Sequence, residues 1–117
     1  MPIDTNDRWI FSGYPGHFIG ASDCLFHLTT YVNNGTWMVS TVGDYRPEYA
    51  NGSTMTSLGT GGHYFETMVF ACRCVHEQSL PEVIDWTEEE STWYSNHAEA
   101  TNGHFQLCYK YQLIARE

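Results

Sequence analysis

The stretch HYFETMVFAC, residues 63 to 72, holds one carboxylate, Glu66, among seven apolar or aromatic residues. Tyr64, Met68 and Phe70 share its side of the predicted strand, which makes that side unusually apolar. Burying a carboxylate costs free energy unless it is paired, and a carboxylate in an apolar cleft often has the shifted pKa that binding or acid/base chemistry uses. Glu66 is therefore either a site residue or a solvated acid on an outer strand face.

A histidine near the C-terminus is the second chemical candidate. His104 follows Gly103, and glycine inside a helix costs about 1 kcal/mol relative to alanine. Gly103 therefore indicates either a close approach of helix and sheet or room for a ligand. His104 is then a general base, a ligand-binding donor or a core histidine, and Tyr94 is a staple residue or a pocket wall.

These residues define the candidate site. The residues expected to bind a ligand or partner are Tyr64, Glu66, Met68, Tyr94 and His104. If the protein is an enzyme, Glu66 and His104 are its acid/base pair. The expected partner of the Glu66 carboxylate is a histidine or a hydroxyl, with His63, Tyr94 and His104 as the candidates.

The cysteines offer a weaker pattern. Cys72, Cys74 and His76 lie at alternate positions of one strand, where neighbours on a face are about 7 Å apart and converge poorly on a metal ion. The sequence therefore predicts no metal and no other cofactor. All four cysteines, with Cys24 and Cys108, are expected to be reduced thiols.

The elements that position these residues begin with a hairpin. Two β-rich runs flank Asn34-Gly35, a strong hairpin signal because a type I′ turn needs positive φ at both central residues. The predicted hairpin covers residues 24–43, and its register sets Tyr31 opposite Met38. The face expected to enter the core carries Phe26, Leu28, Thr30, Val32, Trp37, Val39 and Thr41.

The rest of the chain supplies a second strand region, a helix and loops. Alternating side chains predict a long strand over residues 63–74, and Asn96 with Glu99 three residues later predicts the start of a C-terminal helix. Residues 1–23 are a lead-in segment with one short strand around residues 9–11. Residues 44–62 are predicted as a long loop, and residues 77–92 as a loop or an edge strand around residues 83–86.

Together these elements predict an α+β fold. A small antiparallel β-sheet, formed by the hairpin 24–43 and the long strand 63–74, would carry one C-terminal α-helix packed on one face. A chain of 117 residues fits a single α+β domain over residues 1–117.

The charge balance narrows the function classes. Five Lys and Arg face fourteen Asp and Glu, a net charge of −9, which disfavours direct nucleic-acid binding because phosphate contacts need basic side chains. Whether the acidic surface mimics nucleic acid stays open. No apolar run reaches the roughly 20 residues of a membrane span, and the first residues are acidic where a signal peptide is basic, so a cytoplasmic protein without membrane contact is expected.

Three stretches in order resemble a group of small uncharacterised proteins of tailed phages and prophages. They are MVSTVGDY, FETMVF and YSNHAEATNGH, which match a V-S-T-V strand, an F-E-T-M-V-F strand and a Y-x4-E-A-x2-G-H helix start over residues 25 to 110 or so. The resemblance implies a phage or mobile-element origin and action inside a bacterial host cell. It implies no particular activity.

Three functions follow as hypotheses. The first is a non-enzymatic phage accessory protein that binds a host protein or a small ligand, including a nucleotide-like one, with host-defence antagonism as its concrete form. The second is a small hydrolase or transferase that uses Glu66 and His104. The third is a structural or assembly protein with an aromatic oligomer interface, since four Trp, eight Tyr and six Phe predict a homo-oligomer, first of all a dimer.

Overall fold

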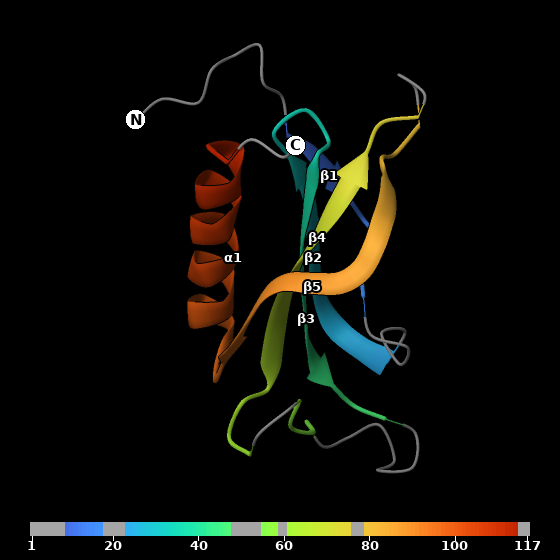
Figure 1. Cartoon of the computed structure of the whole chain (residues 1–117). Coiled ribbons are helices and arrows are strands. Elements are labelled where there is room, and N and C mark those ends of the chain that lie inside the picture. The colour runs from blue at the N-terminus through green and yellow to red at the C-terminus, as the bar shows by residue number, and fades with distance from the viewer. Residues whose placement is uncertain (1–8, 18–22, 48–54, 59–60, 76–78, 115–117) are drawn as a thin grey trace.

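One antiparallel sheet and one helix form the described part of the chain. The computed structural model describes residues 9–17, 23–47, 55–58, 61–75 and 79–114. The strands follow one another in the sheet in the order of the sequence, and α1 lies across one face (Figure 1). The elements are β1 (Ile10–Ser12), β2 (Cys24–Val32), β3 (Trp37–Tyr45), β4 (Phe65–Arg73), β5 (Glu82–Tyr94) and α1 (His97–Gln112). The predicted α+β fold is confirmed.

The hairpin between β2 and β3 has the predicted register. Tyr31 pairs with Met38, and the turn spans residues 33–36 rather than two residues alone. Asn33 and Asn34 have φ angles of 53° and 57°, and the amide of Gly35 donates to the Val32 carbonyl at 3.1 Å. The asparagines adopt the left-handed conformation that the turn requires, so the face assignment of every following residue is kept.

The helix and the first face of the sheet enclose the main core. Asn96 caps the helix, because its side-chain oxygen accepts the Glu99 amide at 2.9 Å. The buried apolar residues of this core come from β2, β3, β4 and α1. They are Val32, Trp37, Val39, Val69, Leu107, Cys108 and Tyr111.

A polar group lies inside the helix-facing layer. His104 is fully buried, and its two ring nitrogens lie 2.8 Å from the Thr30 hydroxyl and 2.7 Å from the Thr41 hydroxyl. Thr41 also bonds Thr67 at 2.6 Å, which links β2, β3 and β4 to the helix. Because every nitrogen of the ring has a partner, the imidazole can stay buried without an unsatisfied group.

The predictions for the edges of the sheet need adjustment. β1 lies within one residue of the predicted short strand, but β5 extends far beyond the four residues predicted for it and includes the acidic run at 88–90. An edge strand tolerates charges because much of it meets water. The carboxylate of Glu90 accepts hydrogen bonds from Lys110 and Tyr111 of α1, which fastens this part of β5 to the helix.

Residues 44–62 are only partly a loop. β3 continues to Tyr45, which forms a bridge with Thr56, while residues 48–54 and 59–60 lie outside the described residues. The predicted long strand is confirmed as β4, from Phe65 to Arg73.

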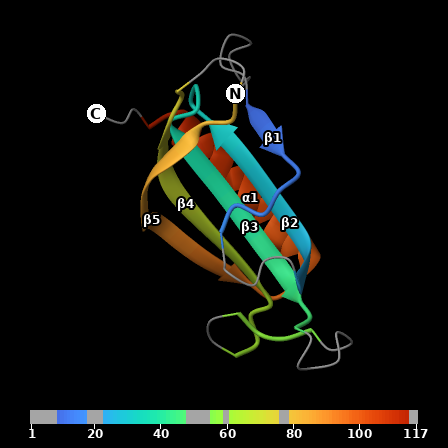
Figure 2. The same ribbon diagram turned by 90° about the vertical axis from the view of Figure 1, so that its right-hand side faces the viewer.

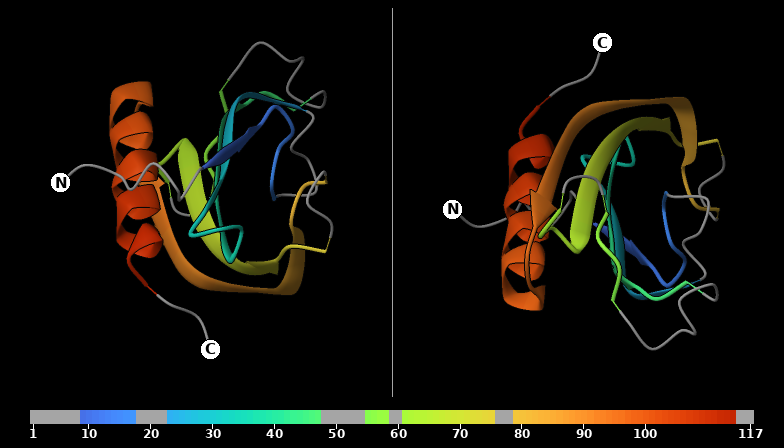
Figure 3. Two further views of the ribbon diagram at one scale, coloured as in Figure 1. Left: turned by 90° about the horizontal axis from the view of Figure 1, so that it is seen from above. Right: turned by 90° about the horizontal axis from the view of Figure 1, so that it is seen from below.

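Part of the second face of the sheet is covered by the segment that follows β1. Figure 2 shows the segment after β1 crossing in front of β2 and β3. The sheet is also curved, with β5 bending away from α1 (Figure 3). A Cβ atom on Gly16 would overlap the hydroxyl of Ser40 in β3, so only glycine lets this segment lie directly on the sheet.

Burial lowers the pKa of His104 from 6.5 to about 4. Between pH 6.5 and about pH 4, His104 therefore binds a proton in the unfolded chain but not in the folded protein. The free energy of unfolding decreases as the pH falls through this window. The loss is roughly 3 kcal/mol, since a difference of one unit between the folded and unfolded pKa corresponds to about 1.4 kcal/mol.

Urea unfolding at pH 7 and pH 4 of the wild type and of a His104→Gln variant measures this effect. We expect the variant to be less stable at pH 7 but to lose about 3 kcal/mol less on acidification. All other titrating groups are shared, so equal losses in the two proteins would contradict the assignment.

Candidate functional site

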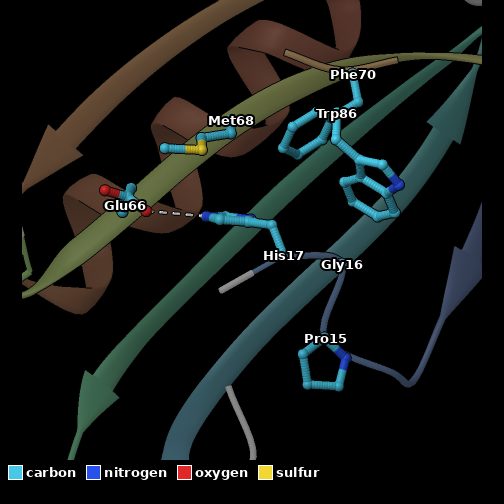
Figure 4. A pocket seen from close by; sticks show the side chains of 7 residues that line it. All are labelled: Pro15, Gly16, His17, Glu66, Met68, Phe70 and Trp86. Carbon is cyan, nitrogen blue, oxygen red and sulfur yellow. Dashed lines mark hydrogen bonds and ion pairs between the residues drawn. The ribbon is translucent and has the colours of Figure 1, made fainter. Parts of the chain in front are cut away.

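A pocket of about 670 Å³ opens on the face of the sheet opposite α1 (Figure 4). Its volume lies in the range of small-molecule sites, roughly 300–1,000 Å³. The walls come from the segment after β1, from β4 and from β5. The lining residues are Pro15, Gly16, His17, Glu66, Met68, Phe70 and Trp86.

Strand alternation places the β4 residues in this pocket. Glu66, Met68 and Phe70 are two residues apart and therefore project from the same face of the strand. Trp86 of β5 packs edge-on against Phe70 with ring centroids 5.2 Å apart, and the His17 ring lies 5.9 Å from Phe70. The pocket is thus an apolar trough with one carboxylate and one imidazole at its end.

Glu66 is held by two donors. Its Oε1 lies 3.1 Å from Nε2 of His17, and its Oε2 accepts the indole N–H of Trp93 at 2.8 Å. Nδ1 of His17 lies 2.7 Å from the Ser40 hydroxyl. The His17 and Glu66 side chains are only 5% and 13% exposed, so the contact is largely shielded from water.

These contacts decide the charge of the carboxylate. The hydrogen bond from His17 lowers the pKa of Glu66 below its usual range, desolvation opposes that change, and the bond from Trp93 adds to the lowering. Glu66 is therefore ionised at neutral pH. Because a carboxylate only accepts, Nε2 of His17 carries the proton that faces it, and Nδ1 accepts the Ser40 hydroxyl when the ring is neutral.

The order hydroxyl, imidazole, carboxylate is that of a hydrolase relay. A nucleophile must reach the substrate, however, and Ser40 is 0% exposed beneath Gly16. The relay therefore holds the segment after β1 against the sheet and fixes the position of the Glu66 carboxylate, which lines the pocket. This arrangement suits binding better than nucleophilic attack.

The structure brings together only part of the predicted site. Glu66 and Met68 both line the pocket, and the partner of Glu66 is a histidine as expected. That histidine is His17, which was not among the candidates. Tyr64 does not line the pocket; it precedes β4, and its amide donates to the Tyr94 carbonyl at 3.0 Å.

The predicted pairing of Glu66 with His104 is wrong. Glu66 and Thr67 are consecutive in β4 and project from opposite faces, and His104 lies on the Thr67 side between two threonine hydroxyls. Tyr94 is on that side too, where its ring packs so closely on Gly103 that a Cβ there would overlap it. Gly103 therefore reflects close packing of helix and sheet, and His104 is a core histidine.

The sequence did not identify His17, Ser40, Trp86 or Trp93 as residues of the site. His17 and Ser40 are joined to Glu66 across long stretches of chain, and Trp86 and Trp93 lie in the acidic segment. The two tryptophans were a usable signal, because a large aromatic residue has little reason to stand in a fully solvated acidic run.

The cysteines of the described residues were a weaker candidate for a site. The four cysteines, all within the described residues, form no disulfide, and burial raises the pKa of Cys24 to about 11 and that of Cys108 to about 12, so both are thiols. Within the described ranges no three His, Cys, Asp or Glu side chains are grouped to hold a metal ion. His76 lies outside those ranges.

Comparison with known proteins adds no assignment. No family model, no curated protein and no solved structure matches the chain. Over the described residues, no helix combines the length and apolar character needed to cross a membrane.

The pKa of Glu66 tests the geometry of the site. His17→Ala removes the larger stabilising contact and leaves desolvation, so the pKa of Glu66 should rise; Trp93→Phe should raise it less. Carbon-detected NMR titration of the carboxyl groups measures both. Lys110→Ala, which removes a partner of Glu90 instead, is the matched control and should leave Glu66 unchanged. An unchanged pKa of Glu66 in the His17→Ala variant would contradict the contact between the two side chains.

Proposed function

We propose that this protein is a non-enzymatic binding protein that takes a small molecule into the pocket beside Glu66. The observation that carries the proposal is an apolar trough of ligand size with an ionised, oriented carboxylate at its end.

The geometry favours binding strongly over a hydrolase or transferase, and less strongly over an oligomer interface. The predicted acid/base pair does not form, and the serine that contacts His17 is buried. An oligomer interface has more support, because Trp86 and Trp93 are 64% and 41% exposed. A homodimer through this face is the second candidate function, since clustered exposed aromatic side chains mark association sites.

The wider biological role is part of the same proposal. The resemblance to phage and prophage proteins supports an accessory role in the cytoplasm of a bacterial host. Host-defence antagonism by sequestration of a small molecule is its concrete form.

Two alanine variants test the pocket. Trp86→Ala removes one wall of the pocket, whereas Phe11→Ala removes an equally exposed aromatic ring, also 64% exposed, from β1. A set of small aromatic compounds is titrated into each protein, with the indole N–H signals of the tryptophans observed by NMR. We expect wild type and Phe11→Ala to bind the same compounds, and Trp86→Ala to bind them about tenfold or more weakly, as for a lost aromatic contact.

Light scattering on the same samples distinguishes the homodimer from the small-molecule pocket. A stable dimer that dissociates in the Trp86→Ala variant, together with no compound bound by the wild type, would replace the pocket proposal by the interface. Equal binding by all three proteins would contradict the assignment of Trp86 to the binding surface.

A further inference from the structure

We propose that the pocket selects a positively charged ligand, an organic ammonium or amidinium group carried on an aromatic or apolar body. This inference rests on the proposed binding function and names the class of ligand. It follows from the charge of the pocket, from the hydrogen-bonding capacity left in it and from the nature of its walls.

The charge of the pocket comes from Glu66. Glu66 is the one acidic side chain among the seven lining residues, and none of the seven is Lys or Arg. The lowered pKa of Glu66 keeps its carboxylate ionised at neutral pH, and the net charge of −9 of the whole chain attracts cations over a longer range. A cationic ligand would therefore meet a favourable potential on approach and a charge partner on arrival.

The hydrogen-bonding capacity points the same way. Both ring nitrogens of His17 are engaged, by Ser40 and by Glu66, and the indole N–H of Trp93 is engaged by Glu66. The donors around the carboxylate are thus used within the protein. Each carboxylate oxygen has accepted one hydrogen bond, and a carboxylate can accept about four in all. The remaining capacity is for donors supplied by a ligand.

The walls suit an organic cation. Phe70 and Trp86 stand edge to face, with an interplanar angle of 63°, and the indole nitrogen of Trp86 points away from Glu66 (Figure 4). Both rings line the same pocket as the Glu66 carboxylate. Tryptophan is the strongest of the aromatic residues in attracting a cation to its face.

Anionic ligands fit poorly. A nucleotide-like ligand was one of the predicted classes, but its phosphates would lie near Glu66 with no basic lining residue except His17, whose nitrogens are both engaged. A bare purine or pyrimidine amine would satisfy the carboxylate, whereas a phosphate would be repelled by it.

Three probes of one shape and different charge test the proposal. Tryptamine is a cation, tryptophol is neutral and indole-3-acetate is an anion, and all three carry the same indole ring on a two-carbon chain. Each is titrated into the full chain at pH 7, and the dissociation constant is obtained from the shifts of the Trp86 and Trp93 indole N–H signals. We expect tryptamine to bind about tenfold more tightly than tryptophol and indole-3-acetate to bind most weakly.

Two carboxylate variants test whether Glu66 causes the preference for the cationic probe. Glu66→Gln should reduce the tryptamine preference to about twofold or less while tryptophol binding persists. Glu90→Gln removes the same charge from a carboxylate that pairs with Lys110 and Tyr111 on the helix side, and should keep the preference. The series on the unmodified protein tests the proposal even if Glu66→Gln does not fold.

The outcomes separate this inference from the proposed function. Binding of all three probes with equal affinity, or tightest binding of the neutral or anionic one, would overturn the charge selectivity and leave the binding pocket standing. A preference that survives Glu66→Gln would overturn the role of Glu66. Binding of no probe at millimolar concentration would contradict both proposals.

Discussion

A single helix can cover only one face of a five-stranded sheet, and the other arrangements in this protein depend on that constraint. The second face is also apolar, with Tyr31, Met38 and Phe70 buried on it. Residues 13–17 cover part of this face by lying directly on Ser40, which only a glycine at position 16 permits. The pocket is the part of the face that this segment and β5 border but do not fill.

One histidine packs on each face of the sheet, and the two have different roles. On the helix side, Thr30 and Thr41 satisfy a neutral His104 that is closed to water, so this histidine serves the fold. On the other side, His17 contacts a carboxylate that borders a pocket, and the contact keeps Glu66 ionised. His104 therefore stabilises the fold, whereas His17 maintains a charged carboxylate at the pocket. Both histidines have hydrogen-bond partners, as buried polar groups require.

The parts of the fold that depend on local sequence were predictable. Asn34-Gly35 marked the hairpin and its register, although the turn spans residues 33–36, and Asn96 with Glu99 marked the helix start. Alternation also placed Glu66 and Met68 on one face, but it could not say which distant segment would meet them. His17 is 49 residues from Glu66 in a segment without periodicity, and β5 was underestimated because an edge strand with an acidic run lacks the alternation of a half-buried strand.

Residues 13–17 lie on the second face of the sheet, and the His17 side chain fixes the position of Glu66. Nuclear Overhauser effects measure that arrangement directly, because they detect protons within about 5 Å of each other. The structure predicts cross-peaks from the His17 ring protons to the Phe70 ring, whose centroid is 5.9 Å away, and to the Ser40 side chain. A His17 ring with contacts to neither residue, in a protein whose Thr41 and His104 signals show the folded core, would contradict the account.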